Sequence, residues 1–123
     1  TQRGKTDPPT TEREKVMANP EVLFNMASTA AHTAVVDAVV DGLDRDLCGL
    51  AWVVIKPARG RFVKYLKDNS IGTNEHGGGW RVPRYAMATY RGQSMGVNEA
   101  AAEAFADVLQ TYGVKAYARS RVD

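Results

Sequence analysis

The pattern of apolar residues predicts a long helix in the first third of the chain. Asn19-Pro20-Glu21 has the features of a helix start, because Asn caps a helix, Pro fits its first position and Glu favours its positive end. Beyond it, two apolar stripes recur at helical spacing, one through Leu23, Ala27, Ala31, Ala34 and Ala38, the other through Val22, Met26, Val36, Val39, Val40 and Leu43. A helix that is apolar around much of its circumference has to be well buried or to pack against another molecule.

A polar segment with a shorter helix is expected before this one. Residues 1–10 are polar and contain Pro8-Pro9, which predicts an extended arm. Thr11 and Glu14 have the spacing of a capping box, so a short helix should run from there to about Ala18. We therefore divide the chain into residues 1–18, an arm with a short helix, and residues 19–123, a single domain.

Shorter apolar segments in the remainder predict strands that alternate with helices. The continuous apolar run from Leu50 to Ile55 is typical of a central strand covered on both faces. After it we expect a helix over 61–69, a turn-rich loop over 69–79, one or two strands over 80–91, a helix capped by Asn98 and closed by Gly113, and a strand over 114–119. N-terminal helices followed by β-α-β-α-β indicate an α+β fold, or a small α/β fold, with helices packed on a small sheet.

Composition narrows the range of cofactors and environments. The chain has 123 residues, of which 44% are hydrophobic, as expected for one globular domain. Its one cysteine, Cys48, cannot form an internal disulfide, and with His32 and His76 it offers too few ligands for a closed zinc site. The longest uninterrupted apolar run is shorter than a membrane span, and the N-terminus lacks the apolar core of a signal peptide. We expect no metal, no cofactor and no membrane.

Two glycine-rich motifs resemble parts of an esterase. His76-Gly77-Gly78-Gly79-Trp80 resembles an oxyanion-hole motif, and Gly92-Gln93-Ser94-Met95-Gly96 matches the nucleophile elbow G-x-S-x-G. However, no histidine follows Ser94, and the two motifs lie too close together for a hydrolase sheet. Glycines that occupy a loop and a turn explain both motifs more simply.

A second catalytic candidate is Cys48, with His32 or His76 as its base. Free cysteines are among the most buried residue types, so a small buried residue at the start of a strand is the simpler interpretation. We therefore lean against an enzyme, and Ser94, Cys48 and His76 stay low-ranking catalytic candidates.

The net charge of +2 conceals an uneven distribution. Residues 51–97 contain eight Lys and Arg against two Asp and Glu, whereas residues 1–50 contain five against eight. Basic side chains neutralise phosphates and exposed aromatic rings stack on bases, so the central segment suits single-stranded nucleic acid. The alternative is an ordinary solvated helix face with aromatic residues in the core. The candidate binding residues are Arg59, Arg61, Lys64, Lys67, Arg81, Arg84, Arg91, Lys115, Tyr117 and Arg119.

Two segments carry a resemblance to a known group of proteins. They are Cys48-Gly49-Leu50-Ala51-Trp52-Val53 and the C-terminal stretch from Gly113 to Arg121, followed by Val122-Asp123. In these segments the chain resembles a group of small tailed-bacteriophage and prophage proteins without an established activity, although Leu50 replaces their usual aromatic residue. The resemblance implies a phage origin, a place in the host cytoplasm or the virion, and no catalytic residues.

Taken together, these patterns favour a non-enzymatic phage or prophage accessory protein. It would bind nucleic acid, or a phage or host protein, through its basic central surface. The alternative is a structural virion or assembly protein that packs through its N-terminal arm and helix as a homo-oligomer. A small Ser or Cys enzyme ranks last.

Overall fold

A computed structural model describes residues 8–45 and 47–123 and has an α+β fold. Its helical segments are α1 (Pro8–Ala18), α2 (Pro20–Val40), the 3-10 turn η1 (Leu43–Arg45), α3 (Arg61–Asp68), α4 (Arg84–Met87) and α5 (Met95–Thr111). Its strands are β1 (Gly49–Ile55), β2 (Thr73–Asn74), β3 (Trp80–Pro83) and β4 (Ala116–Val122). The predicted α+β class is confirmed.

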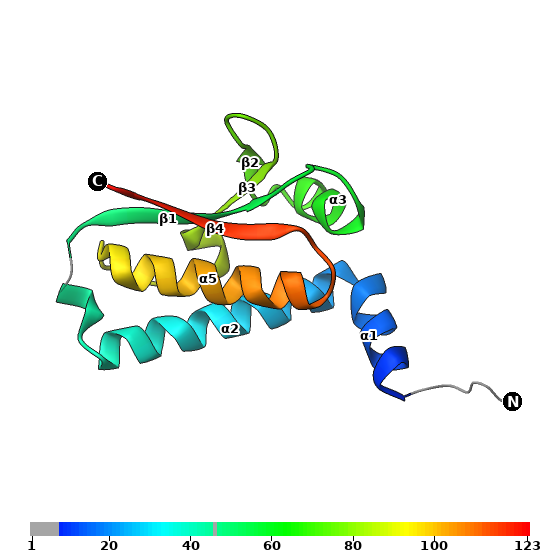
Figure 1. Ribbon diagram of the computed structural model, residues 1–123, viewed down its shortest axis with the longest axis horizontal. Helices are drawn as coiled ribbons and strands as arrows, with labels where there is room; N and C mark the ends of the chain where they lie inside the picture. The colour runs from blue at the N-terminus through cyan, green and yellow to red at the C-terminus, as the bar shows by residue number, and fades with distance from the viewer. Residues whose placement is uncertain (1–7, 46) are drawn as a thin grey trace, which may run out of the picture.

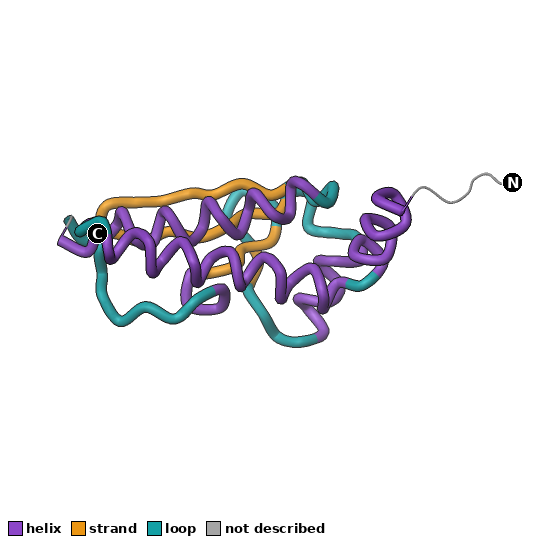
Figure 2. The backbone as a smooth tube through the Cα atoms, turned by 90° about the horizontal axis from the view of Figure 1, so that it is seen from below, coloured by secondary structure: helices purple, strands orange, loops and turns teal. Residues whose placement is uncertain are grey.

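The elements form three layers. Figure 1 shows the sheet above α5, and α2 on the far side of α5 from the sheet. The tube view from below shows α2 and α5 running side by side along the sheet (Figure 2). The β2–β3 hairpin extends one edge of the sheet away from α2, and α3 lies at the end of the sheet, where Tyr65 packs near Phe24 of α2 (Figure 1). One face of the sheet is therefore covered by helices, and the opposite face is not.

The sheet has the strand order β2-β3-β1-β4, and every neighbouring pair is antiparallel. β1 is central, as its apolar sequence predicts, because Val53 lies opposite Val82 of β3 and Ala118 of β4. Side chains alternate between the two faces of a strand. Ala51, Val53 and Ile55 therefore point toward α5, and the side chains between them point to the opposite face.

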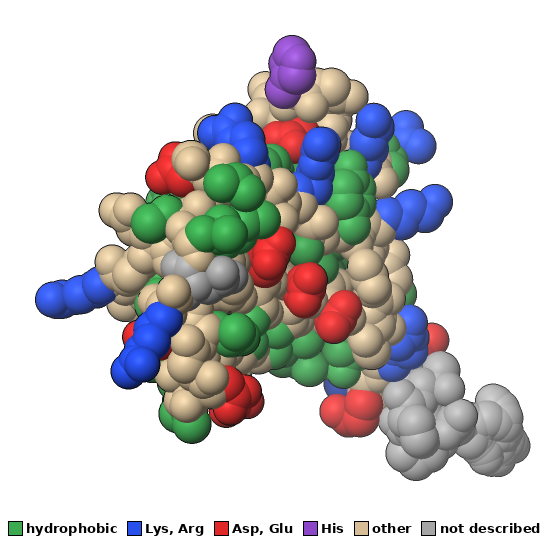
Figure 3. Space-filling model, turned by 60° about the vertical axis from the view of Figure 1, so that its left-hand side comes forward, with side chains coloured by type: hydrophobic (Ala, Val, Ile, Leu, Met, Phe, Trp, Pro, Cys, Tyr) green, Lys and Arg blue, Asp and Glu red, His purple; other side chains and the backbone are tan. Residues whose placement is uncertain are grey.

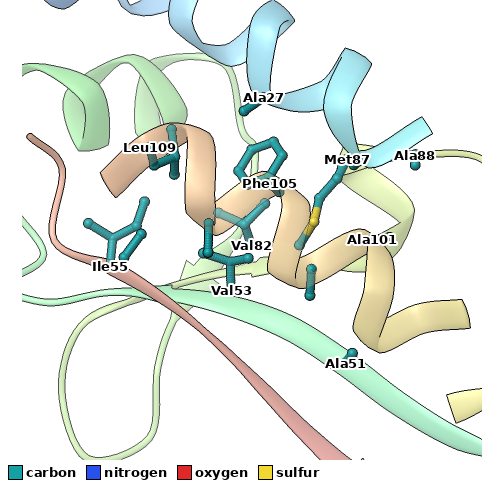
Figure 4. Packing of buried hydrophobic residues seen from close by; sticks show 14 of the residues in the cluster. Ala27, Ala51, Val53, Ile55, Val82, Met87, Ala88, Ala101, Phe105 and Leu109 are labelled. Carbon is teal, nitrogen blue, oxygen red and sulfur yellow. The ribbon is translucent and has the colours of Figure 1, made fainter. Parts of the chain in front are cut away.

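The core fills the space between the sheet, α5 and α2. Phe105 and Leu109 of α5 lie between Val53 and Ile55 of β1 on one side and Ala27 of α2 on the other (Figure 4). Several alanines of the two helices are fully buried, which lets their backbones approach closely. The alanine-rich composition of the long helix is thus explained on one side by its packing on α5.

The N-terminal predictions are partly wrong. α1 begins at Pro8, so residues 8–10 are helical and Thr11 lies inside the helix instead of capping it. The rest of the expected arm, residues 1–7, falls outside the described residues. The start of α2 is confirmed, because the Asn19 side chain accepts a hydrogen bond from the Val22 N–H at 3.3 Å.

The largest errors concern residues 73–98. A short strand, β2, lies within the predicted loop, and residues 84–87 form α4 where a strand was expected. α5 begins one turn earlier than predicted, because Ser94 and not Asn98 is its N-cap. The buried Asn98 side chain instead donates to the carbonyl oxygen of Gly49 at 2.8 Å. In the sequence, an Asn that forms a tertiary hydrogen bond cannot be told from an Asn that caps a helix, and this explains the late start predicted for α5.

Length and composition alone would allow α2 to cross a membrane. In the fold, Leu23, Ala27, Ala31, Val35 and Ala38 of this helix are buried. Only 28% of its most apolar stretch is buried, however, so the face directed away from α5 is largely uncovered. The expectation that the chain binds no membrane stays a prediction.

Candidate nucleic-acid interface

The sheet face opposite α5, which we call the outer face, carries a row of cations and one exposed aromatic ring. Register pairs Trp52 with Arg119, and Val54 with both Tyr117 and Arg81. The outer face is formed by Leu50, Trp52, Val54, Arg81, Tyr117, Arg119 and Arg121, with Lys56 just beyond the end of β1.

Glu75 connects three residues of the outer face. Its carboxylate accepts a hydrogen bond from the Trp52 Nε1–H at 3.1 Å. One of its oxygens lies 3.6 Å from an Arg81 nitrogen, and the other lies 3.6 Å from an Arg119 nitrogen. The Glu75 side chain is 5% exposed, whereas the Arg119 side chain is 50% exposed. The negative charge is therefore buried beneath cations that reach the solvent.

Arg81 is further fixed by the indole of Trp52. Its guanidinium carbon lies 4.0 Å from the Trp52 ring centroid, within the range of a cation–π interaction. Trp52 itself is buried beneath this contact. Arg81 thus has a defined orientation, while Arg119 keeps more freedom to meet a ligand.

The glycine-rich loop of residues 76–79 folds back over the end of β1. Lys56 Nζ donates to the carbonyl oxygen of Gly77 at 3.2 Å. Gly79 has φ +104°, and a Cβ there would lie 3.0 Å from the carbonyl oxygen of Ile55. This close approach explains the requirement for glycine. The resemblance to an oxyanion hole is therefore accounted for by the hairpin, and His76 is exposed on it.

Tyr117 provides an aromatic surface next to the cations. It lies on β4 two residues before Arg119, on the same face, and is 41% exposed. A shallow hollow of about 410 Å³ beside it is lined in part by Lys56 and Lys115. An exposed ring and basic groups therefore lie together, as the sequence predicts for Lys115, Tyr117 and Arg119.

Arg59 and Arg61 lie at the end of the molecule where α3 begins. With Lys115 they line a pocket of about 380 Å³ whose other walls are mostly apolar, among them Phe62 and Tyr112. Lys115 and its neighbours also line the hollow beside Tyr117, so the pocket adjoins the outer face. The pocket is also lined by the start of α2, so Arg59 and Arg61 lie at one end of the sheet, beside the outer face and not on it.

The remaining predicted cations have other contacts. Lys64 forms an ion pair with Asp68 at 2.7 Å on the exposed side of α3. Lys67 Nζ lies 5.3 Å from the Trp80 ring centroid. Arg91 is exposed on the segment before α5.

Arg84 has a structural position. Its Nε–H donates to Asn98 Oδ1 at 2.9 Å, and its Nη1 donates to the carbonyl oxygen of Ala88 at 2.8 Å. Burial lowers the pKa of the Arg84 guanidinium, and its interaction with Tyr90 opposes this shift. We remove Arg84 from the candidate interface, because its donors hold α4 against α5.

The surface view shows how charges are distributed on one side of the molecule. Several Lys and Arg side chains lie on its upper part and Asp and Glu side chains form a row across its middle, while further Lys and Arg side chains project at the left and lower right (Figure 3). The residues that sequence reasoning left out of the interface are Lys56, Arg121 and Glu75. Arg121 continues the alternation of Tyr117 and Arg119, a signal that could have identified it.

The serine candidate is a helix cap. The Ser94 hydroxyl donates to the carbonyl oxygen of Leu43 and accepts from the Val97 N–H, and the residue is 3% exposed. A buried hydroxyl that already donates one hydrogen bond and accepts another does not form an exposed nucleophile elbow. The interpretation of Ser94 as a nucleophile therefore has no structural support.

The cysteine candidate differs from its expected position. Cys48 is exposed, although we expected a small buried residue. Its backbone forms a bridge to Ser94, and its carbonyl oxygen accepts from the Asp123 N–H at 3.1 Å. The chain needs the backbone of residue 48, not its side chain, at this junction. Within residues 8–45 and 47–123, no three His, Cys, Asp or Glu side chains are grouped so as to hold a metal ion.

Replacing the cap tests this assignment. Ser94→Ala should lower the free energy of unfolding by about 0.5–2 kcal/mol, because an N-cap and a buried hydrogen bond are lost. Urea unfolding measures the effect, and Thr89→Ala at an exposed position outside the helices and strands is the control, with a change within about 0.5 kcal/mol. Covalent labelling of Ser94 in the wild-type chain by a fluorophosphonate would contradict the assignment.

We compared the chain with protein families, curated proteins and solved structures. No protein family, curated protein or solved structure matches it. The resemblance to phage proteins, and the location it implies, therefore stay predictions. The functional proposal below therefore rests on the residues and geometry of the outer face.

Proposed function

We propose that the outer face binds single-stranded nucleic acid. The observation that carries this proposal is the exposed ring of Tyr117 beside the half-exposed guanidinium of Arg119, on a sheet face without a helical cover. Single-strand binders combine cations that neutralise phosphates with aromatic rings on which bases stack. Tyr117 would stack a base, and Arg119, Arg121 and Lys56 would contact phosphates.

The charge balance of this face supports an anionic ligand. Glu75 is the one acidic side chain that contacts its arginines among the described residues, and it is buried. The face also carries Lys56 and Arg121, so its cations exceed this one carboxylate and leave a positive charge. Positive surfaces accelerate the association of polyanions and make binding strongly dependent on salt.

Fluorescence anisotropy with a labelled oligothymidine tests the proposal. Tyr117→Ala should weaken binding by about 5- to 150-fold, because one stacked base is worth about 1–3 kcal/mol. Arg119→Ala should reduce the slope of log K against log salt by about 0.7, as one phosphate contact is lost. Tyr85→Ala and Arg45→Ala are matched controls, since these exposed residues lie on α4 and η1.

Glu75→Gln separates the two roles of the central carboxylate. The glutamine side-chain oxygen can still accept the hydrogen bond from Trp52. The negative charge that attracts Arg81 and Arg119 is lost. We expect tighter binding with a steeper salt dependence. Weaker binding, or wild-type binding by both Tyr117→Ala and Arg119→Ala, would overturn the proposal. Binding to polyglutamate that equals binding to the oligonucleotide and is insensitive to Tyr117→Ala would point to an acidic protein instead.

A second candidate function is structural assembly through the N-terminal helices. The observation that favours it is the uncovered side of α2, where Val22, Val36 and Val40 are exposed. Exposed apolar surface of this extent on a helix is typical of an interaction site. The chain should then sediment as part of a larger assembly, and removal of residues 1–18 should release it. Unchanged sedimentation of the shortened chain would exclude a role for that segment.

A further inference from the structure

We propose that α2 pairs in antiparallel orientation with α2 of a second copy of this chain, around a two-fold axis near Ala31. The inference rests on the assembly role suggested above and specifies its partner. It is independent of nucleic-acid binding, because α2 and the outer face lie on opposite sides of the molecule (Figure 1).

The uncovered side of α2 has the residue spacing of a coiled-coil seam. Six of the exposed positions of α2 are separated alternately by four and three residues, which is the heptad spacing of helices that pack on a partner helix. All six side chains are uncharged: Val22, Met26, Thr29, Thr33, Val36 and Val40. The buried positions, such as Ala27, Ala31 and Ala38, lie on the other side of the helix against the core. A solvated helix face normally carries charged residues, and this one has none along its seam.

The seam is complementary to itself when it is reversed. Val22 and Val40 lie nine positions on either side of Ala31, Met26 and Val36 lie five, and Thr29 and Thr33 lie two. An antiparallel pair therefore places apolar residues against apolar residues and the threonine hydroxyls against each other at the axis. Self-complementarity of one patch is the requirement of a two-fold interface.

Charge selects the antiparallel over the parallel arrangement. Asp37, Asp41 and Asp44 lie at or just beyond the C-terminal end of α2. A parallel pair would bring these carboxylates together from both copies, whereas an antiparallel pair separates them by most of the helix length. In the antiparallel pair this end meets the partner's helix N-terminus, whose first turn carries one acidic residue, Glu21. Antiparallel helix dipoles add to the preference.

The exposed side of α2 is less suited to binding a membrane than to pairing with a second copy of the chain. Helices that lie on membranes carry Lys and Arg along their polar side, whereas α2 contains neither. Spanning a bilayer would remove five buried residues of α2 from the core. The hydroxyls of Thr29 and Thr33 at the middle of the seam would find partners in a dimer but not in lipid.

Sedimentation equilibrium of seam variants tests the pairing and its register. Met26→Lys and Val36→Glu should each raise the dimer dissociation constant at least about tenfold, because each places a charge against an apolar side chain. The double variant Met26→Lys/Val36→Glu should recover dimerisation, because position 26 of one copy faces position 36 of the other, twice per dimer. Tyr85→Lys and Tyr85→Glu, at an exposed residue outside the seam, should leave the dimer unchanged. Far-UV circular dichroism confirms that each variant is folded.

Thiol cross-linking tests the orientation separately. In a Cys48→Ser background, His32→Cys lies beside the axis and should be linked to its counterpart by a short bifunctional maleimide. Val22→Cys should not be linked, because the two positions would be about 27 Å apart along the helix. Cross-linking of both variants would indicate a parallel pair and overturn the proposal.

Three further results would also decide whether α2 pairs with a second copy. A monomeric wild-type chain would overturn the pairing, as would vesicle binding that both single variants lose and the double variant does not regain. If the chain assembles but the double variant is not rescued, the pairing is wrong while the assembly role stands. Oligonucleotide binding by the charged variants would be unaffected in each case.

Discussion

Phe105→Ala is expected to lower the free energy of unfolding by about 3–5 kcal/mol. Phe105 is fully buried at the point where the sheet, α5 and α2 meet (Figure 4). Its ring packs edge-on against Phe24 of α2, with the ring centroids 5.6 Å apart. Truncation would leave a cavity that none of the three layers can close alone. A loss of this size is a large fraction of the stability of a small domain.

Urea denaturation with far-UV circular dichroism measures this loss. Tyr85→Ala is the control, because Tyr85 is 77% exposed and its removal should change stability by no more than about 0.5 kcal/mol. A loss below about 1 kcal/mol for Phe105→Ala would mean that the contact between α5 and α2 contributes little to stability.

Gly72→Ala should be the most disruptive of the glycine substitutions. Gly72 has φ +90°, and a Cβ there would collide with the carbonyl oxygen of Arg81 and lie 2.6 Å from Trp80 Nε1. That indole N–H donates to the carbonyl oxygen of Ile71 at 2.9 Å, so the collision also disturbs a part-buried hydrogen bond. We expect a loss of about 3–5 kcal/mol from backbone strain and steric overlap together.

Gly77→Ala separates the two contributions. Gly77 has nearly the same φ, +88°, but nothing lies within 4 Å of a Cβ at that position. It should therefore show the conformational cost alone, about 1–2 kcal/mol. Equal losses for the two variants would exclude steric overlap at Gly72 as the cause.

Local features of the sequence predicted the elements whose signals lie within one segment. The Asn19-Pro20 cap located the start of α2, and the apolar run of β1 identified the central strand. The start of α5 was predicted one turn late, because Asn98 resembles a cap but forms a tertiary hydrogen bond to Gly49. Cys48 was expected to be buried because of its residue type, although its backbone and not its side chain takes part in the junction.

The candidate interface was predicted in its chemistry but not in its membership. An excess of cations with nearby aromatic residues can be read directly from the chain. Sequence spacing could not show that Arg84 holds α4 against α5, or that Glu75 is buried beneath Arg81 and Arg119. Those facts depend on hydrogen bonds and ion pairs between segments that only the tertiary fold brings together.

The sequence by itself determined the α+β class, the long helix and the concentration of positive charge in the central segment. These properties depend on periodicity, capping and composition, which act within a few neighbouring residues. Tertiary structure alone decided that Arg81 joins Tyr117 and Arg119 on the sheet face without a helical cover, and that one side of α2 is buried while the other is exposed. The physical reason is that strand pairing and helix packing join residues far apart in the chain, and no local pattern encodes which partners meet.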